Sequence, residues 1–150
     1  KERLLDKNIM LEKDFIDKGD NAALEALYSN LPSVWNESVF PGFLRKAKQY
    51  NLFKYYYSGT YFSLSQSVEI DAIIKCISDV ALDTKDVLFS CLFFAMKETV
   101  FSKDGHMAQP LNIQKNPERH LKQREKKVID YFMSKLNEFI HKSSSNGSIT

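Results

Sequence analysis

The feature that most constrains the fold is an apolar run over residues 87–96, which only Ser90 interrupts. The run is far shorter than the roughly 20 residues that a membrane-spanning helix needs, so we expect it to be buried inside the protein. Thr84 is placed to cap a helix here, and Asp86 lies near its positive end. The sequence therefore predicts a helix from residue 85 to about residue 101, apolar on nearly all sides, at the centre of the core.

Two other helices carry clear start signals. Asp20 precedes a helix predicted over residues 21–31, where leucines recur at helical spacing. Ser63 is followed three positions later by Gln66, the capping-box pattern in which each side chain bonds the backbone amide of the other residue. We expect this second helix to end near residue 79.

The rest of the chain completes a mainly α-helical prediction. A long helix is expected from Pro117 to about His141, and the residues before Gly19 are compatible with one more. A short β element near residues 55–62 has weak support, and residues 143–150 have the composition of a tail or linker. The expected fold class is a compact helical domain of one unit, with residues 1–142 forming its body.

Composition sets the expected compartment. The 150 residues are 43% hydrophobic, which is enough for a core without disulfides. Cys76 and Cys91 stand inside apolar runs without a metal-ligand or redox motif, so we expect buried free thiols. The first residues show no apolar signal core, and a soluble cytoplasmic protein is the prediction.

Standard catalytic motifs are missing from the sequence. It has no GxSxG, HExxH, GxxxxGK[ST] or GxGxxG pattern. The three histidines, His106, His120 and His141, share no metal-ligand spacing, so no metal site is expected. Glu69 and Asp71 lie two positions apart on a predicted helix, where they face different directions, and we expect both in solvent.

Charge is segregated along the chain. Residues 42–61 carry four bases and no acid, and residues 103–127 carry seven bases and three acids. Acids outnumber bases in residues 1–31 and in residues 62–102. Interleaved aromatic rings in the first basic segment are able to stack on unpaired bases while the cations attract phosphates. The alternative is that the rings fill the core and the lysines are solvated. The pattern is compatible with an anionic partner without requiring one.

Two short strings point to a family. Residues 57–63 read Tyr-Ser-Gly-Thr-Tyr-Phe-Ser, and Ile-Asp-Ala-Ile follows at 70–73; residues 105–110 read Gly-His-Met-Ala-Gln-Pro. Over residues 50–140 the chain resembles the middle region of bacterial adenine-specific DNA methyltransferases of the Dam-like, D12 class. Ser58 and Met107 depart from that pattern, which has glycine and phenylalanine at the matching positions.

The resemblance implies a target-recognition region without the catalytic machinery. Such enzymes, many from restriction–modification systems, bind S-adenosylmethionine through an F-x-G-x-G-like motif and hold the target amino group with a D-P-P-Y-type motif. Neither motif is present in this chain. The expected partners are double-stranded DNA and the rest of the methyltransferase, where S-adenosylmethionine would bind; this chain alone is not expected to be catalytic.

Candidate DNA-binding residues come from the two basic segments and the two strings. Cations would neutralise phosphates, and polar side chains of the strings would reach base edges; Gln109 suits adenine. The candidates are Arg45, Lys46, Lys48, Lys54, Tyr57, Ser58, Thr60, Tyr61, His106, Gln109, Lys115, Arg119, Lys122, Arg124 and Lys126. The alternative function is a helical protein–protein interaction module that docks a partner on the aromatic segment 43–61.

Overall fold

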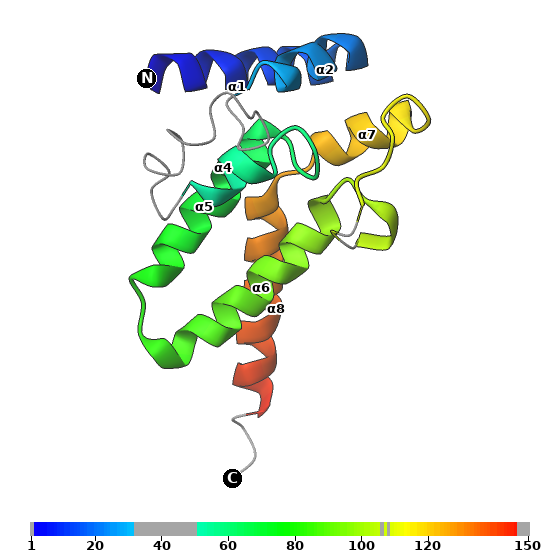
Figure 1. The fold of residues 1–150 in the computed structure, drawn as a ribbon. Coiled ribbons are helices and arrows are strands. Elements are labelled where there is room, and N and C mark those ends of the chain that lie inside the picture. Colours follow the sequence, from blue (N-terminus) through cyan, green and yellow to red (C-terminus); the bar gives the residue numbers. More distant parts are fainter. Residues whose placement is uncertain (1, 32–50, 106, 108, 147–150) are drawn as a thin grey trace.

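A computed structural model describes residues 2–31, 51–105, 107 and 109–146, and it confirms the mainly helical fold class (Figure 1). In chain order the helices are α1 (Glu2–Asp17), α2 (Asn21–Ser29), α4 (Leu52–Tyr56), α5 (Leu64–Ser78), α6 (Leu82–Thr99), the 3-10 helix Lys103–Gly105, α7 (Pro117–Arg124) and α8 (Val128–Asn146). Two isolated bridges, Ser58 with Phe62 and Ser102 with Pro110, are the β structure of the described residues. The short β element expected near residues 55–62 is limited to the Ser58–Phe62 bridge, because Tyr55 and Tyr56 belong to α4.

The core lies between α5, α6 and α8, and α6 packs against both of the others (Figure 1). The side chains that these helices bury together are Ile70, Ile73, Ile77, Cys91, Leu92, Ala95, Val128 and Phe132. The central place predicted for the apolar helix is confirmed, although Leu82 and Phe93 of α6 are 81% and 63% exposed. None of the described helices is long and apolar enough to cross a membrane.

The local helix signals in the sequence hold at two starts. The Ser63 hydroxyl accepts from the Gln66 amide at 3.0 Å, and the Gln66 side chain accepts from the Ser63 amide at 2.9 Å, which completes the capping box. Asp20 caps α2 by accepting from the Ala23 amide at 2.9 Å. Both predictions are confirmed, and α1 is the further helix expected before Gly19.

The start predicted for the central helix is wrong by a turn. The chain enters α6 through Ala81 in extended backbone, and no side chain caps the helix. Thr84 therefore lies inside the first turn, where its hydroxyl contacts the Asp83 carboxylate at 3.3 Å. Asp83, and not Asp86, is the acid of the first turn, where the helix dipole stabilises negative charge.

The long helix predicted over residues 117–141 is two helices, α7 and α8, with a break at residues 125–127. The Gln66 side-chain amide donates to the backbone carbonyls of Gln123 and Lys126 at 2.7 and 2.9 Å. In an uninterrupted helix those carbonyls would accept from amides four residues further on. A contact from α5 thus holds the chain at the point where its direction changes between the two helices.

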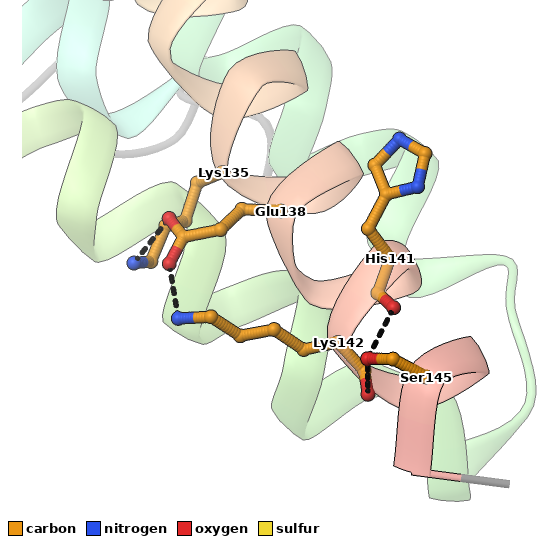
Figure 2. A network of polar contacts seen from close by, with 5 residues as sticks. All are labelled: Lys135, Glu138, His141, Lys142 and Ser145. Atoms are coloured by element: carbon orange, nitrogen blue, oxygen red, sulfur yellow. Dashed lines mark hydrogen bonds and ion pairs between the residues drawn. The ribbon is translucent and has the colours of Figure 1, made fainter. Parts of the chain in front are cut away.

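At the other end, α8 continues to Asn146, beyond the point at which a tail was predicted to start. The Ser145 hydroxyl donates to the backbone carbonyl four residues earlier at 3.0 Å, and Figure 2 shows the ion pairs beside it. Glu138 lies between Lys142 at 2.5 Å and Lys135 at 2.9 Å. Hydrogen bonds from Lys142 and then Lys135 hold the pKa of the Glu138 carboxyl at about 2.

A buried carboxylate joins the N-terminal helices to the core. Glu12 of α1 is 0% exposed and accepts from the backbone amides of Leu64 and Ser65, at the start of α5. It also accepts from the Tyr28 hydroxyl at 2.9 Å. Because the first amides of a helix have no partner within the helix, Glu12 acts as a cap supplied by another helix.

Glu69 and Asp71 of α5 also cap neighbouring helices. The prediction that both side chains are solvated is therefore wrong. Asp71, 5% exposed, accepts from the amides of Phe53 and Lys54 at 3.0 and 2.9 Å and so caps α4. Glu69 accepts from the Ile129 amide at 3.1 Å at the start of α8. Burial raises the pKa of both carboxyl groups.

The two cysteines have different environments. Cys91 is buried in the core, as predicted, and burial raises the pKa of its thiol. Cys76 is exposed, so the prediction of two buried thiols is wrong for this residue. It precedes the buried Ile77 by one position, which on a helix is a rotation of about 100° away from the core.

Candidate nucleic-acid interface

The backbone that follows α6 connects the turn of the first string to Pro110 of the second, although more than forty residues separate the two strings. The Phe101 amide donates to the Tyr61 carbonyl at 2.8 Å, which ties the turn at residues 57–62 to the end of α6. On the other side, the Leu111 amide contacts the Phe101 carbonyl at 3.5 Å, and Ser102 forms a bridge with Pro110. The backbone after α6 therefore lies between the turn and the loop that begins at Pro110.

Glycine is required at the tip of the turn. Gly59 has a φ of +80°, a conformation that L side chains rarely adopt. A Cβ added there would lie 2.7 Å from the Tyr28 Cβ, so the backbone of the turn contacts α2 directly. The Thr60 hydroxyl donates to the Tyr57 carbonyl at 3.1 Å. The turn is fixed against α2, and Thr60 is exposed at its edge.

A pocket of about 280 Å³ opens where the turn meets the loop. Its lining residues are Glu25, Gly59, Thr60, Pro110, Leu111, Asn112, Ile113 and Gln114. The loop has its own support, because the Asn112 side chain accepts from the Lys115 amide at 3.0 Å and the Asn112 carbonyl accepts from the Asn116 side chain at 3.0 Å. We refer to this cavity as the turn–loop pocket.

The loop carries the exposed Lys115 and continues directly into α7, which carries two further exposed cations. Pro117 occupies the first turn of α7, where its missing amide costs no hydrogen bond. Lys115, Arg119 and Lys122 are exposed, and we name these three residues the basic edge. The ion pairs of the described residues involve none of them. Arg119 donates one hydrogen bond to the Ser102 carbonyl at 3.0 Å, which holds it next to the loop.

The opposite face of α7 is buried and carries His120 and Arg124. The Nδ1 atom of His120 lies 2.7 Å from the Asn21 side-chain oxygen, and its Nε2 atom accepts a hydrogen bond from Arg124 Nε at 3.0 Å. Because Arg124 can only donate, the hydrogen of the imidazole is assigned to Nδ1. Burial, and then the positive charge of Arg124, lower the pKa of His120 to about 3.

Arg124 is corrected as a candidate phosphate contact. It is 3% exposed, and its guanidinium donates to the Thr60 carbonyl at 2.7 Å. The guanidinium carbon lies 5.6 Å from the Tyr28 ring centroid and 5.5 Å from that of Phe101. Arg124 is therefore an internal support for the turn, since its charge is enclosed between two rings.

Other candidates are also engaged within the protein. Lys126 donates to the Glu98 carbonyl at 2.7 Å, at the negative end of α6, and is half-buried. Lys54 is half-buried with its ammonium 4.7 Å from the Tyr55 ring centroid. Neither side chain is presented to solvent in the way that the basic edge is.

The aromatic and polar candidates divide in the same way. Tyr57 and Tyr61 pack against the core, with the Tyr57 ring centroid 5.0 Å from that of Phe53, and the Ser58 hydroxyl is buried. Gln109 and Thr60 are exposed. The remaining candidates, Arg45, Lys46, Lys48 and His106, lie outside the described residues, as do residues 43–50 of the aromatic segment of the alternative function.

Sequence reasoning missed the pocket residues Glu25, Asn112 and Gln114. Asn112 had a usable signal, because an asparagine a few residues before a helix commonly accepts a backbone amide in a turn. Glu25 had none, since its proximity to the loop depends on how α2 packs. Within the described ranges, no group of three His, Cys, Asp or Glu side chains is arranged to hold a metal.

Comparison of the chain with protein-family models, curated proteins and solved structures finds no match. The resemblance to Dam-like methyltransferases thus stays a prediction that rests on the two strings. The geometry adds an independent observation: the turn, the turn–loop pocket and the basic edge occupy contiguous parts of the structure.

Proposed function

We propose that this chain binds double-stranded DNA through the basic edge and the adjoining turn–loop pocket. In this proposal it is the target-recognition region of an adenine-specific DNA methyltransferase, and it works in the cytoplasm beside the DNA. S-adenosylmethionine binding and methyl transfer belong to other parts of the parent protein. The observation that carries the proposal is that the exposed Arg119 of the basic edge is hydrogen-bonded to the Ser102 carbonyl, in the segment that forms a bridge with Pro110 of the second string.

Phosphate contacts supply most of the affinity of such a surface. Lys115, Arg119 and Lys122 are exposed without ion-pair partners in the described structure, so neutralising a phosphate breaks no internal salt bridge. Each phosphate neutralised on B-DNA contributes about −0.9 to the slope of log affinity against log salt concentration. Three contacts therefore account for a slope of roughly −2.7.

The test is duplex binding measured by fluorescence anisotropy at several salt concentrations. A variant with Lys115→Ala, Arg119→Ala and Lys122→Ala should bind more weakly, with a slope shallower by about 2 to 3. The matched control replaces three exposed lysines of α1 and α5 that also have no ion pair within the described residues, by Lys7→Ala, Lys13→Ala and Lys75→Ala. Equal slopes for the two triple variants would refute the assignment of the basic edge.

The methyltransferase part of the proposal is tested by the coding sequence that flanks this chain. An F-x-G-x-G-like motif upstream and a D-P-P-Y-type motif downstream are expected. If the flanking sequence encodes neither motif, the methyltransferase assignment fails, whatever the result of the DNA-binding assay.

A second candidate function, protein–protein interaction, is favoured by α8. Ile129, Met133 and Ile140 are 38%, 44% and 51% exposed and lie on one face of the helix. Such a stripe is typical of a helix that docks on another protein. Binding through it would be insensitive to salt and would be lost in a Met133→Asp variant, whereas DNA binding would not change.

A further inference from the structure

The turn–loop pocket has an acidic side chain in its lining and basic side chains near its edge. Among its eight lining residues Glu25 is the one that carries a charge. Outside it, Lys115 follows the lining loop directly, and Arg119 is bonded to the Ser102 carbonyl in the segment that pairs with Pro110. A ligand that fits this pattern has an anionic part outside and a hydrogen-bond donor inside.

Glu25 is held in place by the packing of α2. The helix is capped by Asp20, and the Asn21 side chain contacts the Pro117 carbonyl at 3.3 Å, which links α2 to α7. On the next turn, Tyr28 touches Gly59 and donates to Glu12. These contacts fix the helix that carries Glu25 relative to both walls of the pocket.

The Glu25 carboxylate is available to a ligand. The side chain is half-buried, and within the described structure its carboxylate has neither a hydrogen bond nor an ion pair. An ionised carboxylate accepts hydrogen bonds and cannot donate them. A partly desolvated acceptor of this kind favours a ligand that presents an N–H group.

We propose that Glu25 reads the edge of a base that carries an exocyclic amino group, cytosine or adenine, while the basic edge holds the neighbouring phosphates. This inference rests on the proposed function. The pocket volume of about 280 Å³ leaves room for the edge of a base beside Glu25.

The chemistry also gives discrimination against the other two bases. In the major groove, cytosine presents an N4 amino group and adenine an N6 amino group, both of which donate to a carboxylate. At the matching places guanine and thymine present the carbonyl oxygens O6 and O4. These oxygens would face the Glu25 carboxylate with no hydrogen between them, and this repulsion disfavours both bases.

The experiment uses a library of DNA duplexes with a randomised central region, sequenced after retention by the chain. The wild-type chain should enrich cytosine or adenine at one position by about five- to hundredfold. Glu25→Ala should lose that enrichment and keep the salt slope of the wild type. Glu118→Ala is the matched control, because Glu118 is exposed in the first turn of α7 and lies outside the pocket lining.

The outcomes separate this inference from the proposed function. If Glu25→Ala keeps the enrichment of the wild type, Glu25 does not read a base, and the DNA-binding proposal stands. If Glu118→Ala loses the enrichment as well, the effect is one of overall charge and the inference is overturned. If the wild-type chain retains no duplex at all, the proposed function fails and this inference fails with it.

Discussion

Mild acid should lower the free energy of unfolding of this protein, because His120 is kept neutral in the folded state. The imidazole is 0% exposed, accepts from Arg124 Nε and has its other nitrogen against Asn21, so the folded protein keeps it neutral. A proton would remove the acceptor and place a second positive charge beside Arg124. These effects hold the pKa at about 3 in the folded protein, against 6.5 for an ordinary histidine.

The direction of the change in stability with pH depends on whether the folded or the unfolded protein binds the proton. Below pH 6.5 the unfolded chain takes up a proton at this residue, whereas the folded protein does so only near pH 3. The contribution of His120 to the free energy of unfolding is therefore complete above pH 6.5 and declines as the pH falls towards 3. With 1.36 kcal/mol for each pH unit, the loss between about pH 8 and pH 5 is about 2 kcal/mol.

Urea unfolding of the wild type and of His120→Gln at both pH values measures this loss. Glutamine keeps a donor and an acceptor but does not titrate. The free energy of unfolding of the wild type minus that of His120→Gln should therefore be about 2 kcal/mol smaller at pH 5 than at pH 8. The comparison also removes the contributions of Glu69 and Asp71, which both proteins share. The raised pKa values of these carboxyl groups stabilise the folded protein as the pH falls, which is opposite to the effect of His120. His141→Gln, at an exposed position, should keep the wild-type pH dependence. A gap that is constant with pH would refute the reasoning.

Three further predictions concern stability and are checked by urea unfolding at neutral pH. Glu12→Ala leaves the first amides of α5 buried without an acceptor and should cost about 2 to 4 kcal/mol; a loss below about 0.5 kcal/mol would contradict its role as a cap. Ser63→Ala removes one half of the capping box and should cost about 1 kcal/mol, with unchanged stability as the contrary result. Gly59→Ala forces a Cβ to within 2.7 Å of Tyr28 and should cost more than Gly19→Ala, where the nearest atom is 3.8 Å away and only the positive φ opposes the change. Equal losses in the two glycine variants would show that the contact with Tyr28 is relieved without cost.

Local signals were the part of the fold that could be predicted. The Ser63–Gln66 box and the Asp20 cap depend on residues three positions apart, so their pattern is complete in the sequence. The break between α7 and α8 depends on Gln66, about sixty residues away in the chain. Nothing near residue 125 marks this break, because Lys126 and its neighbours are good helix formers.

The sequence was sufficient to predict which helix carries the basic residues of the candidate site. It was not sufficient to predict which of these residues face the solvent. Arg119, Lys122 and Arg124 have the same chemistry and lie within two turns of each other. Whether a cation is exposed depends on what packs against α7. Arg124 is buried because Tyr28 and Phe101 lie beside it, and neither ring is near it in the sequence.

Gln66 serves two purposes with one carboxamide, since its oxygen closes the start of α5 and its nitrogen holds the junction of α7 and α8. The basic edge is therefore not a portable peptide. Anyone who grafts α7 onto another scaffold would have to carry over the 63–66 segment as well. Without it, the junction of α7 and α8 would lose the two hydrogen bonds that the Gln66 carboxamide donates to it.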